Sequence, residues 1–320
     1  MDSYVFRTEG GELGYFQKDD DACLFFVGAK YFPIHDQISW GEWEDYQSQV
    51  DLDYGVEDPI VKVITHYLRR HGETVSITIK DFSKSTLEAG EYHPRMALDN
   101  CDLYDRLTSE GAFTDEVRAY YNIVDMLDDL FKVIEPTQKN LISYGHKIRE
   151  VLILACTEVE YLLLQFLKDN GYKNKRNYST RDYIKALGPL RLDLYKIKLK
   201  MHPSLNFIAP FCDWNEEQPT KSLTWYDAYN AVKHDRGGNF ESASLEAVIN
   251  AVGAIHILLE AQYGKEIFHK FYLDFKSCFQ TKEYPTWKMS DLQVPVIKCD
   301  WNSEELVWNE PMEYFKENNL

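Results

Sequence analysis

The stretch NLISYGHKIREVLILACTEVEYLLLQFLKDNG, residues 140–171, contains the longest apolar run of the chain. Glu158 and Glu160 interrupt this run, at residues 151–167, so it is too short and too charged to span a bilayer. Gly171 follows as a typical C-terminal stop of a helix. These residues predict one long helix in the core of a helical domain, and no association with a membrane.

Helical patterns flank this stretch on both sides. The pattern before it ends at Pro136, and Thr180 is a candidate N-cap for a helix after it. Helices joined in this way suggest an antiparallel bundle. The five predicted helices cover residues 116–136, 140–171, 180–200, 225–236 and 241–264.

The N-terminal part of the chain has a different pattern. Residues 4–17 predict a β-hairpin with two glycines at its turn, and residues 22–32 and 74–82 predict strands. Between these strands, residues 58–72 have the spacing of a helix. This part therefore predicts a mixed domain of strands and helix.

The C-terminal part contains prolines at 285, 295 and 311, which are typical of extended segments. The fold class predicted for the whole chain is α+β, mainly an α-helical bundle with an N-terminal α+β domain and an extended C-terminal tail. The predicted boundaries are residues 1–115 for the N-terminal domain, 116–277 for the bundle and 278–320 for the tail.

Charge is spread unevenly along the chain. The total is 35 − 52 = −17. Residues 1–60 hold 14 acidic and 3 basic residues, a balance of −11, and residues 168–200 hold 10 basic and 3 acidic residues, a balance of +7. A basic region on an acidic protein can still bind nucleic acid. The acidic N-terminal part suggests a surface that docks a partner or mimics nucleic acid.

The basic region predicts the place of any RNA binding. The alternative is that its lysines only form the solvated face of a helix. The candidate RNA-binding residues are Lys173, Lys175, Arg176 and Arg181.

A second polar group of residues lies in WYDAYNAVKHDRGG, residues 225–238. At about 100° per residue, Tyr226, Asn230 and Lys233 share one face of a helix, and Tyr229 and His234 flank it. A histidine beside cations suits proton transfer next to a phosphate. The alternative is a structural helix end, because Lys, His and Arg in a last turn favour the helix dipole and glycine follows.

Glu160 lies on the apolar face of the long helix, with Arg149 on the same side. A carboxylate in such a place requires a partner or a proton. The sequence predicts a partner on the helix at 225–236, namely Lys233, His234 or Arg236. Such a pair fits a supporting role in catalysis and equally a structural ion pair between two helices.

The residues YNAVKH, 229–234, resemble the motif of the HEPN superfamily (higher eukaryotes and prokaryotes nucleotide-binding), which is an all-helical bundle. Active members have an arginine, usually a polar residue, three further positions and then a histidine. Asn230 and His234 match, whereas Tyr229 stands at the position of the arginine. The resemblance covers about residues 116–265.

This resemblance implies a metal-independent endoribonuclease of a prokaryotic antiphage defence or toxin system, without a cofactor and acting as a homodimer. Lys233 or Arg236 would then replace the missing arginine. The alternative is a catalytically inactive HEPN-like module that binds a nucleotide or docks a protein partner from the same operon. RNA or a nucleotide is the expected ligand.

Other motifs are absent from the sequence. There is no GxGxxG, GxxxxGK[ST], GxSxG or HExxH pattern, and no metal site is predicted. His66 and His71 are five positions apart, one more than a helical metal pair requires, and are expected at the surface. The six cysteines lie far apart and the N-terminus lacks the features of a signal peptide, which favours a cytoplasmic protein.

Overall fold

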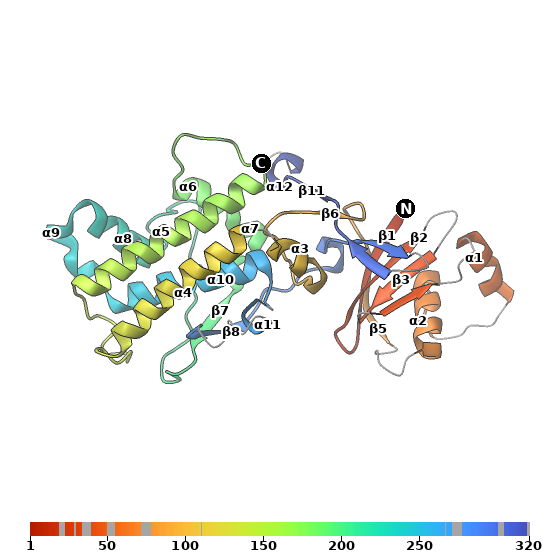
Figure 1. Cartoon of the computed structure of the whole chain (residues 1–320), viewed down its shortest axis with the longest axis horizontal. Coiled ribbons are helices and arrows are strands. Elements are labelled where there is room, and N and C mark those ends of the chain that lie inside the picture. The colour runs from red at the N-terminus through yellow and green to blue at the C-terminus, as the bar shows by residue number, and fades with distance from the viewer. Residues whose placement is uncertain are drawn as a thin grey trace. The chain divides into compact units, whose positions relative to one another are not determined.

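The computed structural model describes residues 1–18, 23–28, 30–33, 40–49, 55–71, 78–109, 111–265, 267–270, 277–299 and 304–318. Of the residues that the structure describes, 48% are helical and 17% are in strands, so the predicted α+β class is confirmed. It forms two compact units (Figure 1). Unit 1 comprises residues 1–92 and 287–312, and unit 2 comprises residues 93–286 and 313–320.

Unit 1 is built on a five-stranded antiparallel sheet with the order β4-β3-β2-β1-β5. The predicted hairpin is present as β1 and β2, with Gly11 at a φ of 91° in its turn. Of the predicted strand at 74–82, residues 74–77 lie outside the described residues. The strands of the sheet are β1 (Asp2–Thr8), β2 (Leu13–Lys18), β3 (Cys23–Val27), β4 (Lys30–Pro33) and β5 (Ile79–Lys84).

Helix α2 (Pro59–His71) covers one face of this sheet. Proline is favourable at the first helical position, and the Asp58 carboxylate accepts hydrogen bonds from the backbone N–H groups of Ile60 and Val61. The core between helix and sheet contains Phe6, Phe16, Phe25, Val63, Ile64 and Leu68. Helix α1 (Trp40–Gln49) is also in this unit.

The C-terminal segment returns to unit 1 rather than forming a separate tail. Its strands are β9 (Val296–Cys299), β10 (Glu304–Val307) and β11 (Glu310–Pro311). Strand β11 pairs in parallel with β6 (Glu91–Tyr92), and the Gln17 side chain accepts a hydrogen bond from the Ile297 N–H at 3.0 Å. The predicted tail at 278–320 is therefore divided between the two units.

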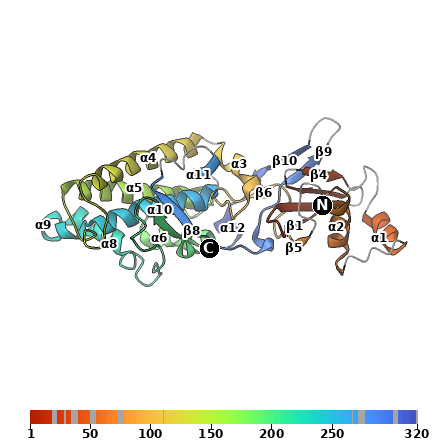
Figure 2. The same cartoon turned by 90° about the horizontal axis from the view of Figure 1, so that it is seen from below.

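Unit 2 consists mainly of helices, with α4, α5, α8 and α10 packed against one another (Figures 1 and 2). The long predicted helix is α5, and Gly171, at a φ of 73°, ends it in a Schellman motif. There the Tyr172 N–H bonds to the Leu167 carbonyl at 2.9 Å, and the Gly171 N–H bonds to the Lys168 carbonyl at 3.1 Å. The helices of unit 2 are α3 (Tyr104–Thr108), α4 (Gly111–Phe131), α5 (His146–Asp169), α6 (Thr180–Tyr183), α7 (Leu187–Leu190), α8 (Thr224–His234), α9 (Arg236–Asn239), α10 (Leu245–Tyr263), α11 (Ile267–Lys270) and α12 (Tyr314–Glu317).

Helix α10 forms the centre of unit 2. The Ser244 side chain caps its N-terminus by accepting a hydrogen bond from the Ala247 N–H. Its length and composition would allow it to cross a membrane, but 89% of its apolar window is buried inside the protein. This burial against α4, α5 and α8 is what the apolar sequence of a core helix predicts.

The predicted helix at 180–200 is largely wrong. The segment is divided into α6, α7 and 3-10 turns, and Lys196–Leu199 forms strand β7, which pairs with β8 (Phe279–Glu283). The N-cap is Ser179 rather than Thr180, because Ser179 and Asp182 form a reciprocal capping box. Positive φ at Arg191 ends α7 and separates it from the strand.

The division into units also differs from the predicted boundaries. Unit 2 begins at residue 93 instead of 116, because Arg95 is buried within it. It includes residues 278–286, because β8 pairs with β7. Pairing between residues distant in the sequence thus sets both boundaries.

Candidate functional site

Helix α8 contains the predicted catalytic residues, and its aromatic side chains anchor it in unit 2. The Trp225 indole donates a hydrogen bond to the Pro210 carbonyl at 2.9 Å. Tyr226 and Tyr229 are buried with their ring centroids 5.4 Å apart. One side of α8 is therefore fixed by packing, and this side includes Tyr229, the residue at the arginine position of the HEPN motif.

Glu160 on α5 makes the predicted contact with α8, but through a phenol. The Tyr226 hydroxyl donates a hydrogen bond to Glu160 Oε1 at 2.6 Å. Burial and this carboxylate raise the pKa of Tyr226. Within the described part of the chain, Glu160 forms no ion pair with Lys233 or His234. Among the described residues, the hydrogen-bond partner of this carboxylate is thus a phenol and not a cation.

Lys233 is bound within its own helix. Its ammonium donates a hydrogen bond to the Tyr229 hydroxyl at 2.7 Å and lies 4.8 Å from the centroid of the same ring. The hydrogen bond to Tyr229 raises the pKa of Lys233, with a further contribution from the charge of Glu160. The cation therefore lies against Tyr229, the residue at the arginine position of the predicted motif.

Of the remaining predicted residues, those whose side chains the structure describes form no hydrogen bond or ion pair with one another. Arg149 donates through Nη2 to the Val232 carbonyl at 3.3 Å, near the C-terminal end of α8, and its buried Nε has no hydrogen-bond partner. Asn230 is half-buried, and His234 is exposed without a hydrogen bond or ion pair to any described residue. The side chain of Arg236 lies outside the part of the chain that the structure describes.

In the basic segment, residues 172–181, both lysines have contacts within the segment or with the residue that follows it. Lys175 pairs with Asp182, and hydrogen bonds from Lys175, Ser179 and Tyr172 outweigh burial and lower the pKa of Asp182. Lys173 lies 5.4 Å from the centroid of the Tyr172 ring.

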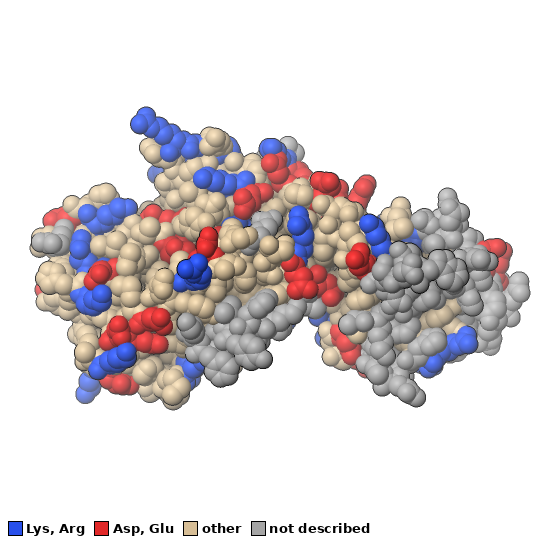
Figure 3. Space-filling model, in the orientation of Figure 1, with Lys and Arg blue, Asp and Glu red and all other residues tan. Residues whose placement is uncertain are grey.

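Arg176 and Arg181 belong to the same segment. Both are exposed, and neither has a hydrogen bond or ion pair to a described residue. Basic side chains gather on this projection between α5 and α6 (Figure 3).

Two of the other lysines in the region 168–200 form ion pairs with carboxylates. Lys185 pairs with Glu216 at 2.7 Å, and Lys196 pairs with Glu283 at 2.8 Å. Two of the four predicted RNA-binding residues, Arg176 and Arg181, therefore present free guanidinium groups, and Lys173 presents an exposed ammonium.

The sequence did not reveal a buried charge cluster around Arg95. Arg95 is 6% exposed and donates to Glu116 at 2.7 and 3.1 Å, to Asp169 at 2.6 Å and to Gln262 at 2.9 Å. Tyr263 also donates to Glu116, at 2.7 Å. The members are far apart in the sequence, so periodicity alone gave no signal.

Glu158 on α5 lies near this cluster without a hydrogen bond or ion pair to a described residue. Burial, together with the charge of Glu116, raises the pKa of Glu158 to about 7. It is thus a carboxyl group that titrates near neutral pH.

A second buried cluster surrounds His256 on α10. Ser277 and the Tyr120 hydroxyl lie 3.1 and 3.2 Å from His256 Nδ1, and Glu260 lies 3.4 Å from Nε2. These residue types resemble a hydrolytic triad, but His256, Glu260 and Ser277 are only 1%, 4% and 3% exposed. The cluster therefore satisfies buried polar groups and offers no access to a substrate.

Among the described residues there is no group of three or more His, Cys, Asp or Glu that could hold a metal ion. Two cavities lie elsewhere in unit 2, and neither is lined by His234, Lys233 or Asn230. Comparison with protein-family models, curated proteins and solved structures gave no match.

Proposed function

We propose that unit 2 is a HEPN-like module that binds RNA through the phosphate backbone, with the basic segment as its contact surface. The observation that carries this proposal is that the guanidinium groups of Arg176 and Arg181 are exposed and have no partner among the described residues. Neutralising phosphates releases counterions, which makes such cations a source of RNA affinity.

Binding without cleavage fits the contacts on α8 better than catalysis does. In the family motif the arginine beside the histidine holds the phosphate. Here Tyr229 occupies that position at 1% exposure, and Lys233 is hydrogen-bonded to it. The cation next to His234 in the sequence is therefore already hydrogen-bonded to Tyr229, which disfavours it as the group that stabilises a developing oxyanion.

The test is the affinity for a labelled single-stranded RNA oligonucleotide at low salt. Arg176→Glu/Arg181→Glu should lower the affinity by about 10²-fold, because two attractive contacts become repulsive. Lys185→Glu/Lys196→Glu changes the net charge equally but alters cations that already have partners, and should cost much less. An equal loss in both double variants would show that only net charge matters and would reject the proposed surface.

The second candidate function is metal-independent RNA cleavage by His234 in a homodimer, as part of a prokaryotic defence or toxin system. It is favoured by the exposure of His234, whose imidazole is not committed to another described group. A second copy of the chain would then have to supply the missing phosphate-binding cation.

Cleavage of RNA by the purified full-length chain, in the presence of EDTA, distinguishes the two functions. For an RNase, His234→Ala should lower the rate by about 10²–10⁴-fold, as expected for a lost acid–base group. The matched control is His146→Ala, which changes another exposed histidine of unit 2. RNA binding without any cleavage would select the binding function.

A further inference from the structure

Two adjoining cavities of unit 2 lie between the N-terminal ends of α8 and α10 and residues 205–213. Their volumes are about 490 and 250 Å³, and both are lined by Ala209, Glu246 and Asn250. Pockets of several hundred Å³ are of the size that binds small molecules. Because the lining residues are shared, the two cavities form one trough.

The charged side chains that line the trough have one sign. Glu246 lines both cavities and Asp213 lines the larger one, whereas no Lys, Arg or His lines either. Both carboxylates are exposed, and neither forms an ion pair with a described residue. These carboxylates attract a cation and repel a phosphate or carboxylate ligand, whereas the N-terminal ends of α8 and α10 favour negative charge.

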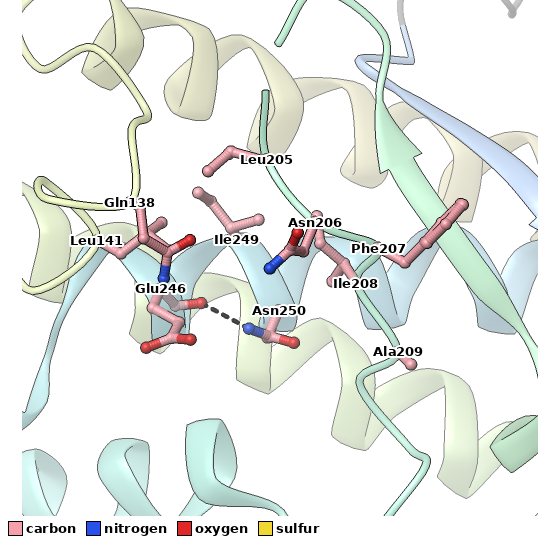
Figure 4. A pocket seen from close by; sticks show the side chains of 10 residues that line it. All are labelled: Gln138, Leu141, Leu205, Asn206, Phe207, Ile208, Ala209, Glu246, Ile249 and Asn250. Atoms are coloured by element: carbon pink, nitrogen blue, oxygen red, sulfur yellow. Dashed lines mark hydrogen bonds between the residues drawn. The ribbon is translucent and has the colours of Figure 1, made fainter. Parts of the chain in front are cut away.

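Polar groups that can accept hydrogen bonds surround the carboxylates. The Asn250 amide donates to the Glu246 backbone carbonyl at 2.9 Å, which leaves its Oδ1 as an acceptor. Figure 4 shows the polar ends of Gln138, Asn206 and Glu246 around the smaller cavity. The larger cavity adds the hydroxyl groups of Ser222, Thr224, Ser242 and Ser244.

The smaller cavity also has an apolar wall. Leu205 and Ile249 are 5% and 2% exposed, and they lie on one side of the cavity in Figure 4. Such a wall removes methylene groups from water, at about 0.8 kcal/mol for each buried CH₂ group. An alkyl chain that carries ammonium groups would meet both kinds of surface.

We propose that this trough binds a linear polyamine. One ammonium group is held by the Glu246 carboxylate and Asn250 Oδ1 where the cavities meet. A second ammonium group is held by the Asp213 carboxylate in the larger cavity. The alkyl chain on the other side of the first ammonium group lies along the apolar wall of the smaller cavity. This site is separate from the basic segment, so its test does not depend on RNA binding.

Isothermal titration of the full-length chain with spermidine tests the site, with 1,4-butanediol as a neutral compound that resembles putrescine. Glu246→Gln should weaken spermidine binding about tenfold or more, since a charge-assisted hydrogen bond is lost. Glu217→Gln removes the same charge from an exposed residue that does not line either cavity, and should leave the affinity unchanged. Butanediol should not bind.

Three outcomes would overturn the proposal. Equal weakening by Glu246→Gln and Glu217→Gln would mean that spermidine acts only as a counterion of the acidic chain. In a parallel titration with guanosine, binding of guanosine in place of spermidine, weakened by Glu246→Gln, would mean that the trough holds a neutral base. Absence of spermidine binding by a chain whose thermal unfolding is normal would mean that the trough is not a polyamine site.

Discussion

Arg95 and the pair Arg176 and Arg181 carry the same guanidinium group in opposite surroundings. Arg95 is buried and donates to Glu116, Asp169 and Gln262, whereas Arg176 and Arg181 are exposed without partners among the described residues. A buried cation whose three nitrogens all donate hydrogen bonds stabilises the folded structure, and its removal leaves buried polar partners unpaired. An exposed cation contributes little to stability and remains available for a ligand.

The largest effect on stability is expected at Arg95. Arg95→Met should lower the free energy of unfolding by about 3–5 kcal/mol, because Glu116 is left charged and buried. Urea unfolding of the full-length chain measures it. The double variant Arg95→Met/Glu116→Gln should recover part of this loss. A loss below about 1 kcal/mol in the single variant would mean that the contacts of Arg95 do not stabilise the fold.

An intermediate effect on stability is expected at the contact between α5 and α8, because Glu160 is half-buried. Tyr226→Phe should lower the free energy of unfolding by about 1–2 kcal/mol, since it removes the hydrogen bond to Glu160. The control is Tyr161→Phe, at a tyrosine that is 40% exposed, which should change stability by less than about 0.5 kcal/mol. Equal changes in the free energy of unfolding for the two variants would mean that the hydrogen bond to Glu160 does not contribute to stability.

Glu158 should make stability depend on pH. Its pKa rises from 4.5 to about 7 on folding, so the folded protein holds its proton more tightly than the unfolded chain. Stability therefore falls as pH increases from 4.5 to 7, and the full loss is present above pH 7. Glu158→Gln should raise the free energy of unfolding by about 1 kcal/mol at pH 8 and by nothing below pH 4.5. Unfolding at both pH values checks this, and a gain that is equal at both would contradict it.

The smallest effect on stability is expected at the exposed pair. Arg176→Gln/Arg181→Gln should change the free energy of unfolding by less than about 0.5 kcal/mol. A larger loss, measured by the same urea unfolding, would mean that these side chains have structural partners.

The sequence predicted the elements whose signals are local. Periodicity identified α2, α5 and α10, and Gly171 correctly marked the end of α5. The segment 180–200 failed because a strand formed from Lys196–Leu199 depends on pairing with Phe279–Glu283, far along the chain. Tertiary pairing there overrides the local pattern.

The side-chain contacts of the candidate site could also be predicted only in part from the sequence. The helical wheel correctly placed Glu160 toward the helix at 225–236, but not on Tyr226, because a wheel gives a direction and not the reach of a side chain. The Arg95 cluster joins segments that no periodicity connects. In contrast, the exposed cations of the basic segment were evident from composition alone, since exposure of charge is the default.

The salt dependence of RNA affinity tests most directly whether exposed cations of the basic segment bind phosphate. For a single strand, each phosphate contact contributes about 0.7 to the slope of log affinity against log salt concentration. Arg176→Gln/Arg181→Gln should therefore reduce the magnitude of this slope by about 1.4, whereas Lys185→Gln/Lys196→Gln should leave it nearly unchanged. Equal slopes for the wild-type chain and both double variants would contradict the account.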